Sequence, residues 1–435
     1  MTEQRIAGCY IPTFDLQGKC DILIEDGVIT AIEPASGSAV GAIDGSGLYA
    51  VPGLTNAHTH SPLSLMRGAA EDVSVDDWFN KRVWPMEVNL TPERVRVGAR
   101  LAIAEMLLGG VTGFADHYFH ADQIAAAAEE LGIRANIAPT FFSTDDHRGR
   151  DEAFAVTRQI AKSGSRRVTA SVGPHSTYTV SEEDLSASAR LADELGIRVH
   201  IHAAENMQQT HSSLDRLGVT PLEVLARTGV LGAGAHIAHG GGIVTDDRDL
   251  LRANAATTTV ACCPKVYFKH DIDPITPIRL LHDVGVTVGA GTDGAAGGNT
   301  LDLWEAMRWT ALAQKRQEHD PLFLATREAF DIGTRGGARA ASHDRSGTIA
   351  QGMAADIVLL DLSRPHCQPI HDVFATLVYS VQPSDVVHVL VDGELVVENR
   401  TLVHADLGEI VGQARDVAPE LVRIHEGEAV QHYAP

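Results

Sequence analysis

Two histidines separated by one residue, His58 and His60, follow an apolar run. The run, Leu48–Leu54, favours a short buried strand. Because side chains alternate between the two faces of a strand, both imidazoles point to the same side. Two imidazoles on one side supply half of a metal site of the kind that zinc uses.

Three further residues with metal-ligand chemistry, His202, His239 and Asp293, each end a later apolar run rich in β-branched residues. An acidic side chain at the end of a buried strand is costly unless a cation pairs with it, and a metal would supply that cation. We therefore expect one divalent metal, with these four ligands: His58, His60, His202 and Asp293. Histidine and carboxylate ligands fit zinc first and ferrous iron second.

Residues that could move protons accompany these ligands. Glu205 lies three residues after His202, within reach of a group held at the metal, and its carboxyl group suits proton transfer. His239, as a neutral imidazole, can orient the attacking water, and Asp293 can accept a proton from it. Glu205, His239 and Asp293 are thus the predicted catalytic residues of a metal-assisted hydrolysis. His200 and His236 share the strands of the ligands and are predicted to be packing or supporting residues.

Each of these residues also has an ordinary structural interpretation. Asp293 can cap the following helix, and Glu205 can be a solvated loop residue. The whole set can belong to a binding protein in which the metal is structural. The presence of Glu205, His239 and Asp293 together argues against that last interpretation, because a structural site is closed and needs no proton transfer.

An alternation of strands and helices must position these residues. Strand patterns follow the first one at 111–116, 134–141, 167–173, 197–203, 235–239, 257–262 and 286–292, and helical patterns between them include 95–108, 121–131, 182–195 and 221–226. This order predicts an α/β chain with a (β/α)8 TIM-type barrel over residues 52–346. In such barrels the functional residues lie at the C-terminal ends of strands, where the five candidates fall.

Short β segments at the two ends of the chain predict a second domain. They lie at 20–24, 28–32 and 48–51 and again at 356–361, 386–391 and 394–397. Asp-Gly turn signals, Asp26-Gly27 and Asp392-Gly393, favour a hairpin in each set. Neither set can bury a core alone, so residues 1–51 and 347–410 are predicted to form one composite β-sandwich. Residues 411–435 are predicted to be a C-terminal tail.

The bulk properties restrict the partners. A formal charge of −22 over 435 residues argues against nucleic acid and anionic membranes as partners. The five cysteines form no C-x-x-C pair, and the first residues lack the pattern of a signal peptide. We therefore expect a cytoplasmic protein that acts on a small molecule, and we expect a homo-oligomer, a dimer or a tetramer.

Three segments resemble the amidohydrolase superfamily. Val51–His60 resembles its first-strand signature, and Gly291–Ala296 with the following Asn299, 301–303 and 305–308 resembles the eighth-strand signature of one branch. That branch holds S-adenosylhomocysteine and 5′-methylthioadenosine deaminases and triazine hydrolases, with guanine deaminases nearby. Gly347–Val358 resembles the return to the sandwich. The resemblance spans roughly 20–400 and implies the barrel, the sandwich and a mononuclear zinc-type site; the fourth strand, 168–173, has no lysine that could bridge two metals.

Two further matches imply substrate-binding residues. His175, within Gly173–Thr179, resembles a ribose-contacting histidine of adenosine-type deaminases, and Glu87, within Trp84–Glu87, resembles a glutamate that holds the ribose hydroxyls. A carboxylate suits two vicinal hydroxyls because it accepts from both. Without the resemblance, both residues read as loop residues that pack or cap their own strands.

Three positions depart from the family pattern. No Ser-Asn follows Cys262-Cys263-Pro264, and Pro139 stands where a relative places an arginine against homocysteine-bearing substrates. The segment His202–Asn206 resembles guanine deaminases as much as adenosine-type deaminases. Lys265, Tyr267 and Lys269 are therefore expected to form either a different substrate wall or a solvated loop.

The resemblance implies hydrolytic deamination of an amino-substituted N-heterocycle with release of ammonia. The leading substrate is an adenine-type nucleoside: adenosine, 5′-methylthioadenosine or an S-adenosylhomocysteine-like compound. The alternatives are hydrolysis of a guanine, pterin or s-triazine ring, dechlorination included, and a non-catalytic metal-binding barrel.

Overall fold

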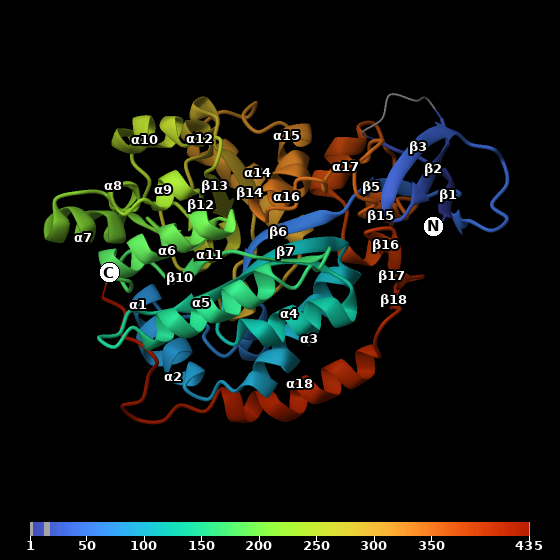
Figure 1. The fold of residues 1–435 in the computed structure, drawn as a ribbon. Helices are drawn as coiled ribbons and strands as arrows, with labels where there is room; N and C mark the ends of the chain where they lie inside the picture. Colours follow the sequence, from blue (N-terminus) through green and yellow to red (C-terminus); the bar gives the residue numbers. More distant parts are fainter. Residues whose placement is uncertain (1–2, 13–17, 435) are drawn as a thin grey trace.

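The computed structural model describes residues 3–12 and 18–434 and contains the predicted barrel (Figure 1). Its strands are β6 (Leu54–Thr59), β7 (Val111–Tyr118), β8 (Arg134–Phe141), β9 (Val168–Ala170), β10 (Gly173–Pro174), β11 (Val199–Ala203), β12 (Ala235–His239), β13 (Thr259–Cys262) and β14 (Thr287–Ala290). They pair in parallel in the orders β10-β8-β7-β6, with β9 on β8, and β11-β12-β13-β14. A parallel bridge from Ser176 to His202 joins the two sheets on one side. On the other side the Asp293 amide donates to the His58 carbonyl, 3.0 Å away.

The longer helices that follow these strands cover the outside of the barrel. They are α3 (Pro92–Leu108), α4 (Ala121–Leu131), α5 (Arg148–Ala161), α6 (Glu182–Leu195), α7 (Met207–Leu217), α8 (Pro221–Arg227), α10 (Arg248–Ala253), α12 (Ile278–Val284) and α14 (Leu303–Gln317). The bounds of α6 follow from its ends: the Ser181 side chain accepts from the Asp184 amide, and Gly196 ends the helix in a left-handed conformation. The predicted fold class is confirmed.

Four short helical segments between β6 and α3 form a wall above the C-terminal ends of the strands. They are η1 (Ser61–Met66), α1 (Val75–Trp78), η2 (Phe79–Val83) and α2 (Trp84–Glu87). Two more, α11 (Pro264–Lys269) and α13 (Ala295–Gly298), follow β13 and β14. These segments bring aromatic side chains to the end of the barrel that carries the candidate site.

Both ends of the chain build the second domain. One sheet has the order β3-β2-β1-β4, formed by β1 (Glu3–Cys9), β2 (Cys20–Glu25), β3 (Val28–Pro34) and β4 (Ile43–Asp44). The other has the order β18-β17-β16-β15-β5, formed by β5 (Tyr49–Pro52), β15 (Ile357–Leu360), β16 (Val386–Val391), β17 (Glu394–Glu398) and β18 (Thr401–Leu402). Ile6 and Ile22 from the first end share a buried core with Ile357 and Leu390 from the second, so the sandwich is composite, as predicted.

The first strand differs from its prediction. The run 48–54 is divided at Gly53: β5 pairs with β15 in the sandwich, and β6 is the first barrel strand and contains His58. The division has a steric reason, because a Cβ on Gly53 would lie 2.0 Å from Thr112 Oγ1. The chain therefore passes close to β7 at this point, where only glycine fits.

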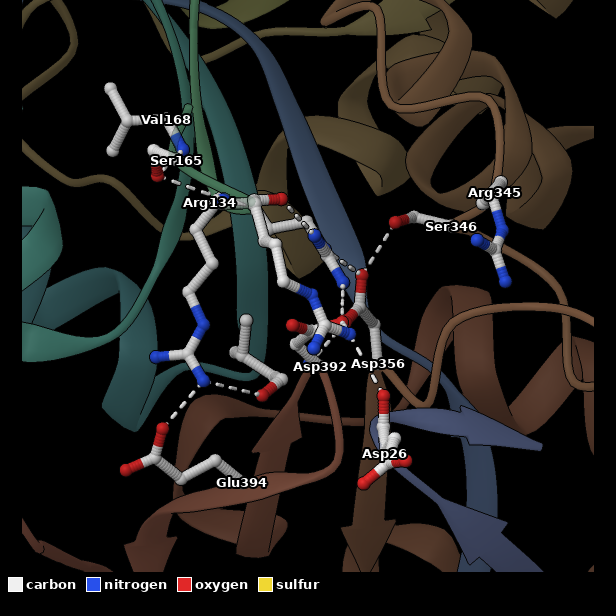
Figure 2. A network of polar contacts seen from close by, with 12 residues as sticks. Asp26, Arg134, Ser165, Val168, Arg345, Ser346, Asp356, Asp392 and Glu394 are labelled. Atoms are coloured by element: carbon white, nitrogen blue, oxygen red, sulfur yellow. Dashed lines mark hydrogen bonds and ion pairs between the residues drawn. The ribbon is translucent and has the colours of Figure 1, made fainter. Parts of the chain in front are cut away.

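A buried ionic cluster fastens the sandwich to the barrel (Figure 2). Arg134, on β8, places Nε 2.6 Å from Asp356 and a terminal nitrogen 2.9 Å from Asp392. Asp356 also accepts from the Ser346 hydroxyl and the Asp392 amide. Because Arg134 belongs to the barrel and both aspartates belong to the sandwich, the cluster fixes the relative position of the two domains.

The segment predicted as a tail is anchored along the barrel. The helix α18 (Leu407–Leu421) begins before the predicted boundary at 411 and packs on α3. Asn89 Nδ2 donates to the carbonyls of Leu421 and Arg423, so the chain beyond α18 stays on the barrel. In Figure 1 its end lies on the opposite side of the molecule from the sandwich. Among the described residues, every helix is too short or too polar to span a bilayer.

Candidate metal centre and substrate pocket

Nitrogen and oxygen atoms of the predicted ligands converge at the C-terminal end of the barrel. One ligand atom from each of His58, His60 and His202 lies within 4.8 Å of the others, and the same holds for His58, His239 and Asp293. His60 Nε2 lies 3.3 Å from His202 Nε2, and Asp293 Oδ1 lies 3.3 Å from His60 Nε2 and 3.7 Å from His58 Nε2. These separations suit one ion about 2.0–2.2 Å from each ligand.

The hydrogen bonds of the imidazoles prepare them for a metal. His60 Nδ1 lies 2.6 Å from the His117 carbonyl, and His202 Nδ1 lies 2.9 Å from the His175 carbonyl. Because a carbonyl only accepts, each Nδ1 carries the proton and each Nε2 presents a lone pair to the centre. His58 Nε2 is buried and has no hydrogen-bond partner among the described residues. The donor set therefore fits a divalent metal.

Burial also favours the neutral form of the histidine ligands. It lowers the pKa of His58 and of His202 well below the ordinary histidine value, and the neighbouring imidazoles lower both further. Each therefore stays neutral, which is the form that binds a metal.

The backbone aims His239 and Asp293 at the centre. Both have a left-handed conformation, with φ of 73° and 59°, which is unfavourable for residues other than glycine. The His239 carbonyl is held by the hydroxyls of Thr276, at 2.6 Å, and Tyr267, at 3.1 Å. The Gly294 amide donates to Asp293 Oδ1 over 2.7 Å. The strain is thus maintained by bonds to neighbouring elements.

Glu205 faces the same hollow as His239 and Asp293. The Tyr178 hydroxyl donates to its Oε1 over 3.2 Å, and its own amide donates to Gln209 Oε1 over 3.0 Å. Burial raises the pKa of the Glu205 carboxyl, while His239 partly counteracts it. A raised pKa keeps more of this carboxyl protonated near neutral pH, as a proton donor requires.

Glu87 and His175 lie beside this group. Glu87 is 5% exposed, its Oε1 accepts from the Tyr118 hydroxyl over 2.6 Å, and its Oε2 is buried without a partner among the described residues. Burial raises the pKa of Glu87 to about 7. The His175 Nδ1 contacts the Thr179 hydroxyl at 2.8 Å, and burial lowers the pKa of this ring to about 3.

The structure places the predicted site residues together. All of them except His58, which lies buried behind, line one hollow: Glu87, His175, Glu205, His60, His202, His239 and Asp293. The two supporting histidines are also close, since His200 Nε2 lies 2.9 Å from His58 Nδ1 and His236 binds Thr259 and the Ala57 carbonyl.

The expected wall after β13 is smaller than predicted. Lys265 pairs with Glu305 at 2.8 Å and Lys269 with Glu71 at 2.7 Å, and neither lines the hollow. Tyr267 does line it. Both lysines are held by partners on other elements.

Tyr433 is a residue that sequence reasoning did not select. It is 2% exposed, and its ring stacks on Phe79 with centroids 4.6 Å apart and meets Tyr178 edge-on at 5.5 Å. The Asn80 side chain holds its backbone at both ends, accepting from the amide and donating to the carbonyl. Its only signal in the sequence is a single aromatic residue after a polar stretch, 425–432.

His117 was missed as well. It lines the hollow with both ring nitrogens buried and unpartnered by any described residue. A histidine within the apolar strand pattern of β7 was the available signal.

Comparison with known proteins agrees with this geometry. The model of the amidohydrolase family matches residues 49–396. A protein of Natronomonas pharaonis named 5-methylthioadenosine/S-adenosylhomocysteine deaminase is 34% identical, over 98% of this chain and 100% of its own. A protein of Thermococcus kodakarensis with the same name is 36% identical, over 87% of this chain and 89% of its own.

Solved structures resemble the fold of this chain closely. A zinc-bound adenosine deaminase from Xanthomonas campestris has a TM-score of 0.90 at 29% identity, over 96% of this chain and 98% of its own. The zinc complex of an atrazine chlorohydrolase from Arthrobacter aurescens has a TM-score of 0.83 at 27% identity, over 95% and 100%. The family model matches most of the chain, and the relatives from Natronomonas pharaonis and Thermococcus kodakarensis are more than 30% identical to it, so the protein belongs to the amidohydrolase family.

Proposed function

We propose that this amidohydrolase is a divalent-metal-dependent deaminase of an adenine-type nucleoside. The observation that carries the proposal is the position of Glu205, a half-buried carboxyl with a raised pKa, in one hollow with the ligand cluster and with Glu87 and His175. The relatives named as nucleoside deaminases support the same substrate class.

The metal would be held by the three ligands with free Nε2 atoms, His58, His60 and His202, together with Asp293. Zinc is our choice because two similar structures contain it and because these ligands suit it. When bound, such an ion lowers the pKa of a coordinated water and so supplies a nucleophile at neutral pH.

The side chains of the chain itself perform the proton transfers. Glu205 gives a proton to the ring nitrogen next to the amino-bearing carbon, which makes that carbon electrophilic. His239 and Asp293 orient the attacking water and take its proton as the carbon–oxygen bond forms. That proton passes to the amino group, the carbon–nitrogen bond breaks, and ammonia leaves. The remaining proton of the added hydroxyl returns to Glu205 as the ring carbonyl forms, which restores the protonated carboxyl. Acid–base help of this kind contributes about 10²–10⁴-fold.

Glu87 and His175 would fix the sugar. The unpartnered Glu87 Oε2 and its bonded Oε1 can accept from two vicinal hydroxyls. His175, neutral because its pKa is lowered, can exchange one hydrogen bond with the ribose through Nε2.

The proposal is tested by product release from zinc-loaded protein over a panel of adenosine, 5′-methylthioadenosine, guanine, pterins and amino- and chloro-triazines. Ammonia is measured for the amino-substituted rings and chloride for the chloro-triazines. Turnover of the nucleosides is expected, and turnover of other rings alone would refute it. The panel includes triazines because triazine hydrolases are among the similar structures. Failure of every compound with metal bound would favour the non-catalytic barrel.

Three sequence predictions accompany this proposal: a cytoplasmic location, a homo-oligomer, and domain boundaries at 51/52 and 346/347. Light scattering of the purified chain would determine the oligomeric state.

A further inference from the structure

We propose that the pocket holds the 5′ end of the nucleoside in an aromatic subsite without a positive charge. The protein would therefore use an apolar 5′ substituent, such as methylthio, and discriminate against a homocysteine tail. This inference rests on the proposed function, and it separates two substrates that the names of the relatives join.

Aromatic rings surround the region next to the proposed sugar site. Phe142 lies 4.8 Å from the His175 ring and 6.0 Å from Trp84, between centroids, and Phe119 lies 5.6 Å from Phe142. All three of these side chains line the hollow that also contains Glu87. A sugar held by Glu87 and His175 would thus direct its 5′ carbon toward aromatic surface.

No lysine or arginine is among the described residues that line this hollow. A second hollow continues from it and shares Glu87, Tyr118, Phe119, Thr140 and Phe142. Its further lining residues include two acids, Asp122 and Glu152, and again no described lysine or arginine. A long 5′ tail in either hollow would meet apolar or negative surface.

The two arginines that follow Phe142 most closely in the sequence, Arg148 and Arg150, have other partners. Arg150 lies 2.8 Å from Asp184 and 2.9 Å from Asp151. The Arg148 side chain is 76% exposed and pairs with Asp146 at 3.3 Å. Neither lines the two hollows.

The two substituents therefore differ in what they lose on binding. A homocysteine tail carries an ammonium group and a carboxylate. Its ammonium group can pair with Asp122 or Glu152, but its carboxylate would give up water without gaining a cation and would lie near these two acids. A methylthio group leaves no charge behind and gains sulfur–aromatic contacts. This difference in binding between the two substituents follows from the residues that line the two hollows, and it is independent of the proton transfers at the ring.

The test compares kcat/KM for 5′-methylthioadenosine and S-adenosylhomocysteine on the same zinc-loaded preparation. We expect at least about a tenfold preference for the first, which is the effect of one missing charged hydrogen bond. Equal values would overturn the inference and leave the proposed function intact. No ammonia from either nucleoside or from adenosine would refute the proposed function itself.

Two pairs of variants locate the cause. Glu152→Arg should raise the ratio of S-adenosylhomocysteine to 5′-methylthioadenosine turnover at least severalfold above the ratio in Glu152→Gln, which removes the charge without adding a cation. Similar ratios in both variants would overturn the placement of the tail. Arg148→Ala tests whether this exposed arginine reaches the tail. If it lowers turnover of S-adenosylhomocysteine but not of 5′-methylthioadenosine, relative to Glu152→Gln, then Arg148 contacts the tail and the inference is wrong.

Discussion

The burial of Glu87 in the pocket should make the stability of the protein depend on pH. Its pKa of about 7 in the folded chain, against an ordinary 4.5, reflects burial that a single bond from Tyr118 only partly offsets. At high pH the folded protein must bury a carboxylate, whereas the unfolded chain exposes it. The pKa difference corresponds to about 3 kcal/mol of unfolding free energy.

The sign follows from proton binding. Between pH 4.5 and 7 the folded state holds a proton on Glu87 that the unfolded state has released, so stability falls as pH rises. Glu87→Gln keeps an oxygen for the Tyr118 hydroxyl and cannot ionise. The stability of the wild type relative to this variant should therefore fall by about 3 kcal/mol, mostly between pH 5 and 8.

Urea unfolding of the metal-free proteins at several pH values measures this difference, because other titrating groups, the histidines included, cancel between the two chains. The exposed Glu129, changed to Gln, is the matched control for the same substitution at the surface. A difference between wild type and Glu87→Gln that is flat from pH 5 to 8 would refute the assigned environment of Glu87. The KM for a ribonucleoside should also fall as pH rises through about 7, since ionised Glu87 accepts both hydroxyls.

Further predictions concern the acid, the metal, the domain junction and the aromatic wall. Glu205→Gln should lower ammonia release about 10²–10⁴-fold with unchanged metal content by atomic absorption, and near-normal turnover would exclude Glu205 as the proton donor. A chelator should abolish turnover and lower the melting temperature, and added zinc should restore both; activity without metal would contradict the proposed centre. Arg134→Met leaves Asp356 buried without its cation, and Asp392 with only the exposed Arg166, and should cost about 3–5 kcal/mol in urea unfolding; Arg166→Met should cost far less. Tyr433→Ala removes the ring behind Phe79 and should raise the nucleoside KM about two- to tenfold, with Tyr433→Phe close to wild type; equal KM values would show that the wall does not depend on this ring.

Local sequence patterns were sufficient to predict the bounds of elements whose ends are marked by nearby residues. The helix at 182–195 and the strand at 134–141 have the predicted bounds, because a cap or a turn signal marks their ends. The region 167–173 was predicted as one strand but forms β9 and β10, with Ser171 and Val172 between them. A Cβ on Gly173 would lie 2.6 Å from the Pro139 carbonyl, an approach to β8 that no local pattern reveals.

In the candidate site, too, some residues could be predicted from local patterns and others could not. Spacing and strand ends were enough to select His58, His60, His202, His239 and Asp293, since parallel strands bring their carboxyl ends together. The position of Tyr433 depends on Asn80, far away in the sequence, and the pairing of Lys265 depends on Glu305. Such contacts are set by tertiary packing, so a single sequence does not contain them in a readable form.

The pairing of Val51 with Val358 affects how the chain is made. About 300 residues separate these partners, and a ribosome needs roughly 15–60 s to add that number. During this interval β5 lacks its ladder partner β15 and, among the described residues, has only the bridge from Tyr49 to Tyr10, and the apolar faces of β1 to β3 stay uncovered. The nascent chain should therefore depend on molecular chaperones until the last strands leave the ribosome. Translation that stalls before residue 357 should leave an incomplete chain that is prone to aggregate.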